Sequence, residues 1–348
     1  MILFSLLLCA CGGNKITPDV PDSSKEAEQT ADKTSHPWDV NRGKEVHPSA
    51  GNGWTVTVID EGITYYAFDG KESVTGTNQR IFVTDIDLNN PAYAVKLAYY
   101  SGRSTASKVF SSTGAIACIN GGYEMTSIYV NINGSTRGSI ANDYITSGDY
   151  RIPQWKSEAA VYLDNDRDVR IRFTGKGKNL AEWRAVYSQE AKTEKNFLTS
   201  TPMLIDDFEP VGESFCTLHP VQYPSCSEDP NVHQGSNTNP RTALATTESG
   251  HVLFIVVDGR REGISRGISA AHLTRFLVKN FNPQYAINLD GGGSSTMCVR
   301  GQGDPFSHVV NYPCDNRSKD ANGSPKENGG PDHAGERSVP TFFYVVKK

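Results

Sequence analysis

The sequence has 348 residues, a formal net charge of −5 and 37% hydrophobic residues, which is enough for one large core or two modest ones. The mild acidity and the lack of basic runs argue against nucleic acid as the main partner. No internal stretch is long and apolar enough to span a membrane, and the 32 glycines suit a turn-rich, strand-rich protein.

The first residues resemble the leader of an exported bacterial lipoprotein. The apolar run Met1–Leu8 is followed by Cys9, Ala10 and Cys11, so a small residue stands directly before Cys11, as in a lipoprotein processing box. The usual basic residues before the apolar run are missing. We expect residues 1–11 to be a signal that ends at a lipidated Cys11, with an ordinary secretory signal as the alternative. The lipid would be the only membrane contact, at the periplasmic face or the surface of the outer membrane.

A polar segment follows the signal. Residues 12–50 consist largely of Pro, Ser, Asp, Glu, Lys and Thr, and such a composition cannot bury a core. We therefore expect a flexible tether over 12–50 and one folded domain over 51–348.

Five of the 7 cysteines lie beyond the signal. Several pairings are open to them; short disulfides between Cys216 and Cys226 and between Cys298 and Cys314 would leave Cys118 over. No C-x-x-C motif occurs, so a structural zinc site is not expected.

The first half of the domain reads mainly as strands. β-Branched and aromatic residues predict a hairpin over 54–68, and a short helix is expected over 105–112. Other predicted strands cover 80–86, 92–100, 115–120, 128–132, 159–163, 169–173 and 203–207. Residues 177–199 read as helix plus loop.

The turn Asp164–Asp168 has the alternating acids of a calcium loop. It lacks the glycine at the sixth position and the distal glutamate of such a loop, and it joins two strands. A solvated hairpin turn is the expectation, with a structural calcium ion as the alternative.

The second half has a sharper pattern. Residues 212–240 are rich in Pro, Ser and Asn and are long enough to be a lid or an insertion. Strands are predicted over 241–246, 252–257, 285–290 and 341–346, with a helix over 270–280. The strand–helix–strand unit near 252–290 implies a locally parallel pair whose carboxyl ends meet at one edge. The fold class is therefore α+β: a strand-rich single domain with a mixed sheet and few helices.

The strand over 285–290 delivers Asp290 into a loop of three glycines and two serines, Gly291 to Ser295. Glycines let the backbone turn sharply and approach a ligand, and successive N–H groups with serine hydroxyls can seat an anion. A carboxylate beside such a seat is a candidate acid, base or nucleophile. The loop is neither a Walker loop nor a G-x-G-x-x-G fingerprint, and a plain tight connection is the competing interpretation.

Further polar side chains gather at strand ends. Carboxylates grouped with arginines favour an anionic substrate that needs acid–base chemistry, and the planar guanidinium suits phosphate because it makes bidentate contacts. For any single arginine, a surface ion pair is the simpler interpretation. The set comprises Asn120, Asp258, Asp290, Glu336, Arg241, Arg260 and Arg337.

These motifs resemble the phosphodiester glycosidase family. The resemblance spans about Trp54 to Lys348, and it departs from the family pattern at Glu124-Met125 and in the 212–240 insertion. Both departures bear on substrate choice more than on reaction type. The motifs are INGGYE at 119–124, NPRTALA at 239–245, VVDGR at 256–260, INLDGGGSST at 287–296 and GERSVP at 335–340.

The resemblance implies hydrolysis of sugar-1-phosphate diesters, such as phosphorylated GlcNAc glycoconjugates, at the anomeric C–O bond, without a cofactor. Arginines can stabilise the departing phosphate, while a carboxylate supports an oxocarbenium-like transition state. Asp290 is then the candidate base or nucleophile, with Glu336 as its partner. The phosphate would be held by Arg241, Arg260, Arg337, Gly292, Gly293, Ser294 and Ser295. The sugar would be oriented by Asn120, Gly121, Gly122, Asp258 and Asn288.

Two other functions stay open. A metal-dependent phosphodiesterase would attack phosphorus, and the lack of an H-x-H or D-x-H motif counts against it. A non-catalytic glycan-binding surface lipoprotein could use the same cavity, although binding alone does not call for clustered carboxylates. A serine hydrolase is disfavoured because no G-x-S-x-G occurs and no histidine is placed to serve Ser294.

Overall fold

The computed structural model describes residues 42–141, 144–147, 150–153, 156–165, 167–173, 180–214, 238–315 and 332–348. The predicted signal with Cys11, most of the predicted tether, the Cys216–Cys226 pair and the bulk of the 212–240 insertion lie outside the described residues. Among the residues described, no helix combines the length and the apolar character needed to cross a bilayer.

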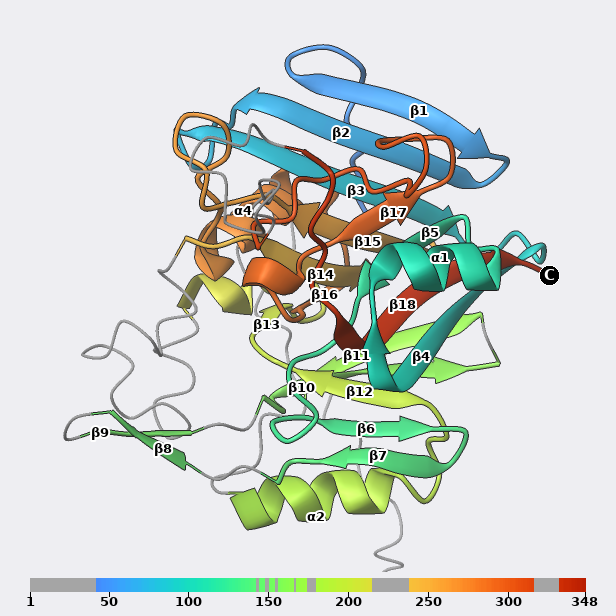
Figure 1. Ribbon diagram of the computed structural model, residues 1–348, viewed down its shortest axis with the longest axis vertical. Helices are drawn as coiled ribbons and strands as arrows, with labels where there is room; N and C mark the ends of the chain where they lie inside the picture. Colours follow the sequence, from blue (N-terminus) through green and yellow to red (C-terminus); the bar gives the residue numbers. More distant parts are fainter. Residues whose placement is uncertain are drawn as a thin grey trace, which may run out of the picture. The chain divides into compact units, whose positions relative to one another are not determined.

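The largest sheet contributes most of the site. Its seven strands lie in the order β1 (Trp54–Asp60), β2 (Ile63–Lys71), β3 (Asn78–Asp87), β15 (His251–Val257), β14 (Arg241–Thr246), β16 (Tyr285–Asn288) and β13 (Met203–Ile205) (Figure 1). The predicted hairpin over 54–68 is confirmed, with Trp54 paired to Phe68. Strand β14 is buried along its whole length, as expected for a central strand that is covered on both faces.

Two smaller sheets complete the frame. One has the order β11 (Asp168–Phe173), β10 (Ala159–Asp164), β12 (Phe197–Ser200), β6 (Tyr129–Ile132) and β7 (Ser135–Ser139). The other has the order β17 (Met297–Val299), β5 (Ala117–Asn120), β18 (Val339–Lys347) and β4 (Tyr93–Ser104). Strands β8 (Tyr144–Ser147) and β9 (Tyr150–Pro153) pair separately. Asp164 pairs with Asp168 across the β10–β11 hairpin, which confirms the predicted hairpin turn.

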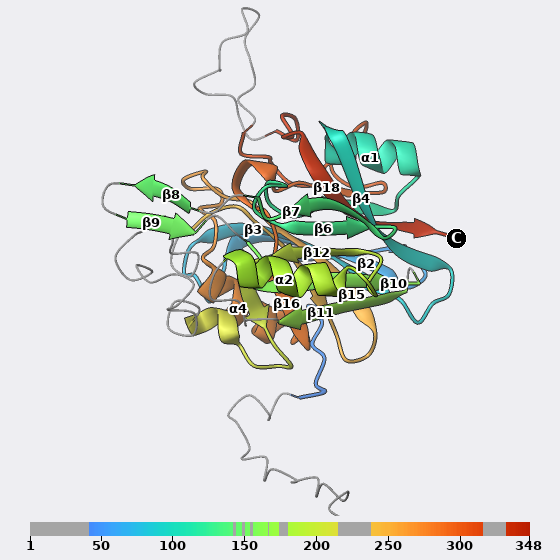
Figure 2. The ribbon, with the colours of Figure 1, turned by 90° about the horizontal axis from the view of Figure 1, so that it is seen from below.

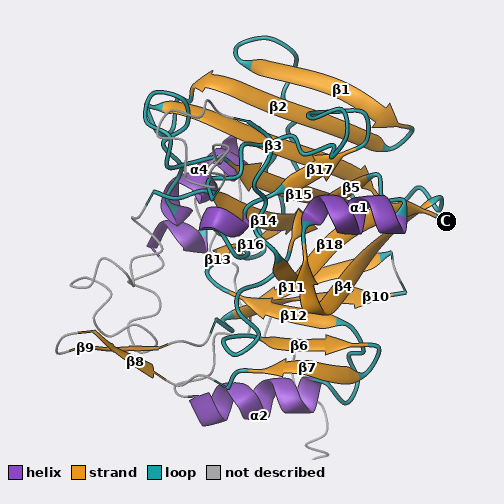
Figure 3. Ribbon diagram, viewed as in Figure 1, coloured by secondary structure: helices purple, strands orange, loops and turns teal. Residues whose placement is uncertain are grey.

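Few helices accompany these strands (Figure 3). Helix α1 (Ala106–Thr113) begins at Thr105, whose side chain accepts a hydrogen bond from the Lys108 amide, and ends at Gly114 with φ 65°, a left-handed conformation that favours glycine. Helix α4 (Ala270–Asn280) has the predicted bounds. Its apolar face packs with the seven-stranded sheet in one buried cluster.

Helix α2 (Leu180–Glu190) covers the five-stranded sheet, lying across β10 and β12 in Figure 2. Trp183 and Tyr187 belong to a buried cluster with Tyr129, Tyr162 and Phe197. Aromatic rings in these arrangements bury large areas and add favourable ring–ring contacts.

The strand–helix–strand unit brings two strand ends together. β15 and β16 each pair antiparallel with β14, so they run in the same direction with β14 between them instead of being neighbours. Their carboxyl ends nevertheless reach the same edge of the sheet, where Asp258 and Asp290 follow. The strand-rich α+β fold is thus confirmed.

The Cys298–Cys314 disulfide, one of the pairings that the sequence left open, is not formed. Cys298 is buried in β17, opposite Cys118 of β5. Among the described residues, the three cysteines Cys118, Cys298 and Cys314 are free. The Cys314 sulfur lies 3.8 Å from Nη1 of Arg260.

Residues 42–50, predicted to belong to the tether, lie against the domain; we call them the strap. Arg42 forms an ion pair of 2.9 Å with Asp207. The amide of Val46 donates to the Phe281 carbonyl over 3.4 Å, and His47 lies 3.5 Å from a carboxylate oxygen of Asp85. The contacts of the folded domain therefore include residues before 51.

Candidate active site

A cavity of about 260 Å³ lies where the loops around β14, β15, β16 and β18 meet. It brings together the glycine loop, Asp290 and all three predicted arginines. The lining residues are Tyr123, Asn239, Pro240, Arg241, Arg260, Asp290, Gly291, Gly292, Gly293 and Arg337.

Asp290 is held rigidly by its backbone. Its amide donates to the Gly121 carbonyl over 3.1 Å, and its carbonyl accepts from Nδ2 of Asn120 over 2.7 Å. The Oδ1 atom of Asn120 accepts in turn from the Thr242 hydroxyl and the Thr296 amide. Asn120 is buried and does not line the cavity. Its predicted contact with a sugar is therefore corrected: it positions Asp290.

The Asp290 carboxyl faces the cavity but is surrounded by protein atoms. Burial raises its pKa to about 6, while the hydrogen bond with Ser294 and the charge of Arg337 lower it and the charge of Glu124 raises it further. A carboxyl group that changes protonation close to neutral pH is suited to proton transfer.

The glycine loop owes its shape to close contacts. A Cβ on Gly291 would lie 2.7 Å from the Pro240 carbonyl oxygen, and Gly292, with φ 61°, lies beneath the Arg260 guanidinium. The amides of Gly292, Ser294 and Ser295 bond to carbonyls of Pro240, Gly291 and Gly292. Since these donors are used within the loop, the anion contacts predicted for the backbone there fall largely to arginine.

The three arginines differ in setting. Arg241 is buried, its Nε donates to the Ile268 carbonyl over 3.1 Å, and burial together with the charge of Arg260 lowers its pKa. Arg260 donates from Nε and Nη2 to Oδ1 of Asn239. Arg337 reaches the Ser294 hydroxyl from Nη1 over 3.4 Å.

Glu336 is not brought to Asp290. Its carboxylate accepts from the Ser107 amide over 2.9 Å and from the Ser107 hydroxyl, at the first turn of α1, where unpaired amides favour an acceptor. It does not line the cavity. The predicted catalytic partnership is therefore corrected to a helix-capping contact.

Asp258 also has a supporting position. Its buried carboxylate accepts from Nδ2 of Asn311 and from the Tyr312 amide over 3.0–3.1 Å, with Nη1 of Arg80 3.7 Å away. Burial raises its pKa to about 7 against the charge of Arg80. It fixes the loop after β17 and does not line the cavity, so its predicted contact with the sugar is corrected.

Several residues near the site were not predicted. Tyr123 lines the cavity, donates to the Thr201 carbonyl over 3.0 Å and accepts from Nδ2 of Asn288; Asn288, a predicted sugar contact, is thus buried behind Tyr123. Lys156 lies 5.8 Å from the centre of the Tyr123 ring. Tyr123 belongs to the motif INGGYE at 119–124, and this motif is the signal in the sequence that pointed toward it.

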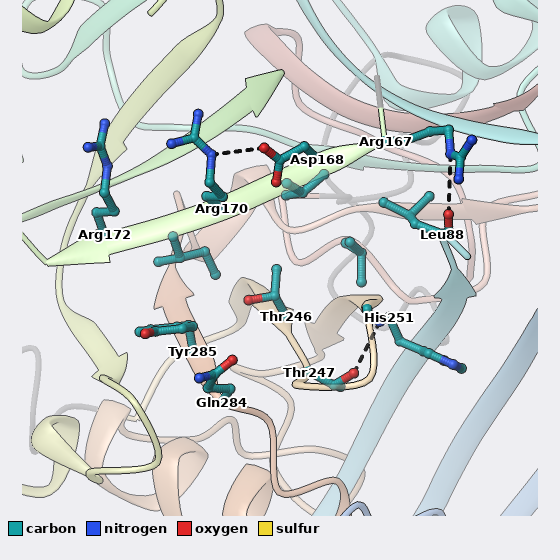
Figure 4. A pocket seen from close by; sticks show the side chains of 14 residues that line it. Leu88, Arg167, Asp168, Arg170, Arg172, Thr246, Thr247, His251, Gln284 and Tyr285 are labelled. Atoms are coloured by element: carbon teal, nitrogen blue, oxygen red, sulfur yellow. Dashed lines mark hydrogen bonds and ion pairs between the residues drawn. The ribbon is translucent and has the colours of Figure 1, made fainter. Parts of the chain in front are cut away.

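A second cavity of about 320 Å³ lies between β11 and the other ends of β14–β16 (Figure 4). Arg170 and Arg172 project from β11 away from Thr246 and Tyr285. Both arginines form ion pairs with Glu194, so they are neutralised by the protein itself. In the part of the chain that the structure describes, no three His, Cys, Asp or Glu side chains are arranged to hold a metal ion. The grouped acid and arginines belong to the smaller cavity.

Comparisons with known proteins give one family. A family model described as phosphodiester glycosidase matches residues 113–346. The chain is 37% identical to N-acetylglucosamine-1-phosphodiester alpha-N-acetylglucosaminidase of Bos taurus over 75 residues, which are 22% of this chain and 12% of that protein.

Two solved structures share the fold. The catalytic domain of the zebrafish enzyme of the same name, auto-inhibited by its pro-peptide, superposes with a TM-score of 0.53 at 15% identity over 88% of this chain and 87% of that one. A protein of Burkholderia pseudomallei gives a TM-score of 0.51 at 12% identity over 88% and 99% of the two chains. At such identities the likeness shows the fold alone.

Proposed function

The chain belongs to the phosphodiester glycosidase family, and from that premise we propose that it hydrolyses sugar-1-phosphate diesters at the anomeric C–O bond. The observation that carries this proposal is the cavity in which Asp290, with a pKa of about 6, faces Arg260 and Arg337 across the glycine loop. The products would be a free sugar and a phosphomonoester.

The arginines would stabilise the negative charge of the leaving group. When the anomeric C–O bond of the phosphodiester breaks, the departing phosphomonoester gains negative charge, and preorganised cationic donors stabilise that charge without reorganising. Arg260 lies over Gly292, Arg337 reaches the Ser294 hydroxyl, and both line the cavity, so both are placed to meet one phosphate. The need for a separate general acid is small because phosphate monoesters are good leaving groups.

Asp290 would act on the sugar. As a carboxylate it can attack the anomeric carbon or remove a proton from water while positive charge develops on the ring. Its backbone is anchored to Asn120 and Gly121, which keeps the carboxyl group at a fixed place relative to the arginines. The Tyr123 hydroxyl bonds to the Thr201 carbonyl and to Nδ2 of Asn288, and these bonds keep that wall of the cavity in place.

Isotope labelling tests the reaction. The chain without residues 1–41 is incubated with a GlcNAc-phosphate diester in oxygen-18 water. Label in the released sugar supports C–O cleavage. Label in the phosphate would mean attack at phosphorus and would contradict the proposal.

Asp290→Asn provides the matched control, because the amide keeps the shape of the side chain and removes the titratable group. The variant should lose about 10²–10⁴-fold in kcat with unchanged thermal unfolding. Full activity in this variant would remove Asp290 from the mechanism, whatever the labelling shows.

A further inference from the structure

The proposed phosphate site already contains an anion from the chain itself. Oδ2 of Asp315 accepts from Nε of Arg337 over 2.7 Å and from Nη2 over 2.5 Å. The Asp315 carboxyl group also lies directly on Gly293: a Cβ at Gly293 would be 2.1 Å from Cγ and 2.2–2.3 Å from the two oxygens. The carboxylate thus occupies the place over the glycine loop where a phosphate oxygen would meet Arg337.

The preceding residues hold Asp315 there. Buried Asp258 binds Asn311 and Tyr312, which fixes the start of the segment that leads to Asp315. The Cys314 sulfur lies 3.8 Å from Nη1 of Arg260. The consecutive residues Cys314 and Asp315 therefore contact two of the arginines that line the cavity: Cys314 contacts Arg260, and Asp315 contacts Arg337.

We propose that Asp315 is a specificity-determining residue, whose carboxylate competes with substrate phosphate for Arg337 and selects ligands by charge. This inference rests on the proposed function, because it takes the same cavity as the phosphate site. A phosphodiester carries one negative charge. A phosphomonoester carries between one and two near neutral pH, because its second pKa is about 6.

The selection follows from repulsion between like charges. Asp315 already occupies Nε and Nη2 of Arg337, so a bound phosphate either displaces Asp315 or shares Arg337 with it. Where the two anions share the arginine, the repulsion grows with the charge on the ligand. Asp315 therefore weakens the binding of a dianionic product more than that of a monoanionic substrate, and it limits product inhibition.

If Asp315 had a purely structural role, its removal would change phosphate affinity in the opposite direction. If Asp315 only oriented Arg337, its removal would free the guanidinium to move and would weaken phosphate binding. If Asp315 competes with phosphate, its removal strengthens that binding. The sign of one measured change separates the two roles.

The test is isothermal titration of the protein with inorganic phosphate and with dimethyl phosphate, a monoanionic diester, at pH 8. Asp315→Asn keeps the size of the side chain and removes the charge. Inorganic phosphate should bind this variant at least tenfold more tightly than the unmodified protein, and the gain for dimethyl phosphate should be smaller. Asp315→Glu, which keeps the charge, should bind inorganic phosphate less tightly than Asp315→Asn does.

Asp69→Asn is the matched control. Asp69 also pairs with an arginine, Arg80, over 3.2 Å. Unlike Arg337, Arg80 does not line the cavity, so phosphate affinity should stay within twofold. Weaker or unchanged phosphate binding in Asp315→Asn overturns the inference, and so does equal tightening for both ligands. The titration needs no turnover, so tighter binding without hydrolysis would count against the proposed function alone.

Discussion

At the scale of single residues, the protonation of Asp290 governs the chemistry. Burial raises the pKa of its carboxyl group, Ser294, Arg337 and the Gly291 amide lower it, and Glu124 raises it further. The carboxylate must be ionised to act as base or nucleophile. With the pKa at about 6, kcat/KM should fall as the pH drops below about 6. A rate that rises on acidification would instead assign Asp290 as a proton donor.

We call the fall of kcat/KM below about pH 6 the acidic limb. Removing a negative charge or a positive charge near Asp290 should shift this limb in opposite directions. Glu124→Gln removes a negative charge, so the limb should shift to lower pH. Arg337→Gln removes a positive charge, so the limb should shift to higher pH. Because the Glu124 side chain is 68% exposed and paired with Arg103, its effect should be about a few tenths of a pH unit and should shrink in high salt. Shifts of the same sign in both variants would contradict this account.

At the scale of elements, Glu336 links β18 to α1. Glu336→Ala removes an acceptor of the Ser107 amide at the first turn of the helix, and losing such a cap should cost about 1–2 kcal/mol of unfolding free energy. Since Glu336 does not line the cavity, kcat should stay within about twofold. Urea unfolding and steady-state kinetics on the same preparation measure both quantities. A large fall in kcat at unchanged stability would return Glu336 to the catalytic group.

The strap depends on pH through two histidines. Hydrogen bonds to Asp85 raise the pKa values of His47 and His251. Burial raises the pKa of Asp85, but its hydrogen bonds with the two imidazoles lower that pKa by more and hold it below the usual range. A raised histidine pKa adds stability below the unfolded value of about 6.5, which is lost as pH rises through the folded value. The lowered pKa of Asp85 adds stability above about pH 4, which is lost on acidification.

The contribution of the strap is therefore largest between about pH 4 and 6.5. Asp85→Asn should cost about 1 kcal/mol more at pH 6 than at pH 9, after allowing for solvent screening of the partly exposed imidazoles. Chemical unfolding at the two pH values measures the difference. An equal loss at both would show that the ion pairs do not matter to the strap.

At the scale of the whole molecule, the lipid anchor stays a prediction. If Cys11 is lipidated, cells fed a radiolabelled or alkyne-tagged fatty acid should incorporate it into the protein, and Cys11→Ala should abolish the label and release the protein from membranes. Cys9→Ala is the matched control and should keep the label. Labelling that survives Cys11→Ala would contradict the assignment.

Much of the fold could be predicted from local sequence. Helix α4 and the hairpin β1–β2 carry strong periodicity and turn residues, and both appear where they were expected. The insertion of β14 between β15 and β16 could not be predicted, because strand order depends on long-range pairing that no local pattern encodes.

Some features of the site could also be predicted from local sequence, and others could not. Asp290, the glycine loop and the three arginines converge because short motifs place them at strand ends. The structural contacts of Glu336 and Asp258 could not be predicted, since each contacts a segment far away in the sequence. Asp315 follows no recognisable pattern, and only the fold brings it to Gly293.

The position of β18 constrains how the protein is made. In the four-stranded sheet, residues 339–347 lie between β4 and β5 and pair with both. Those two strands occur more than 200 residues earlier, so a ribosome must synthesise the chain through residues 339–347 before they gain their shared neighbour. Until then β5 has an open edge and the apolar side chains beside it lack cover. A nascent chain therefore cannot complete this sheet until residues 339–347 have left the ribosome.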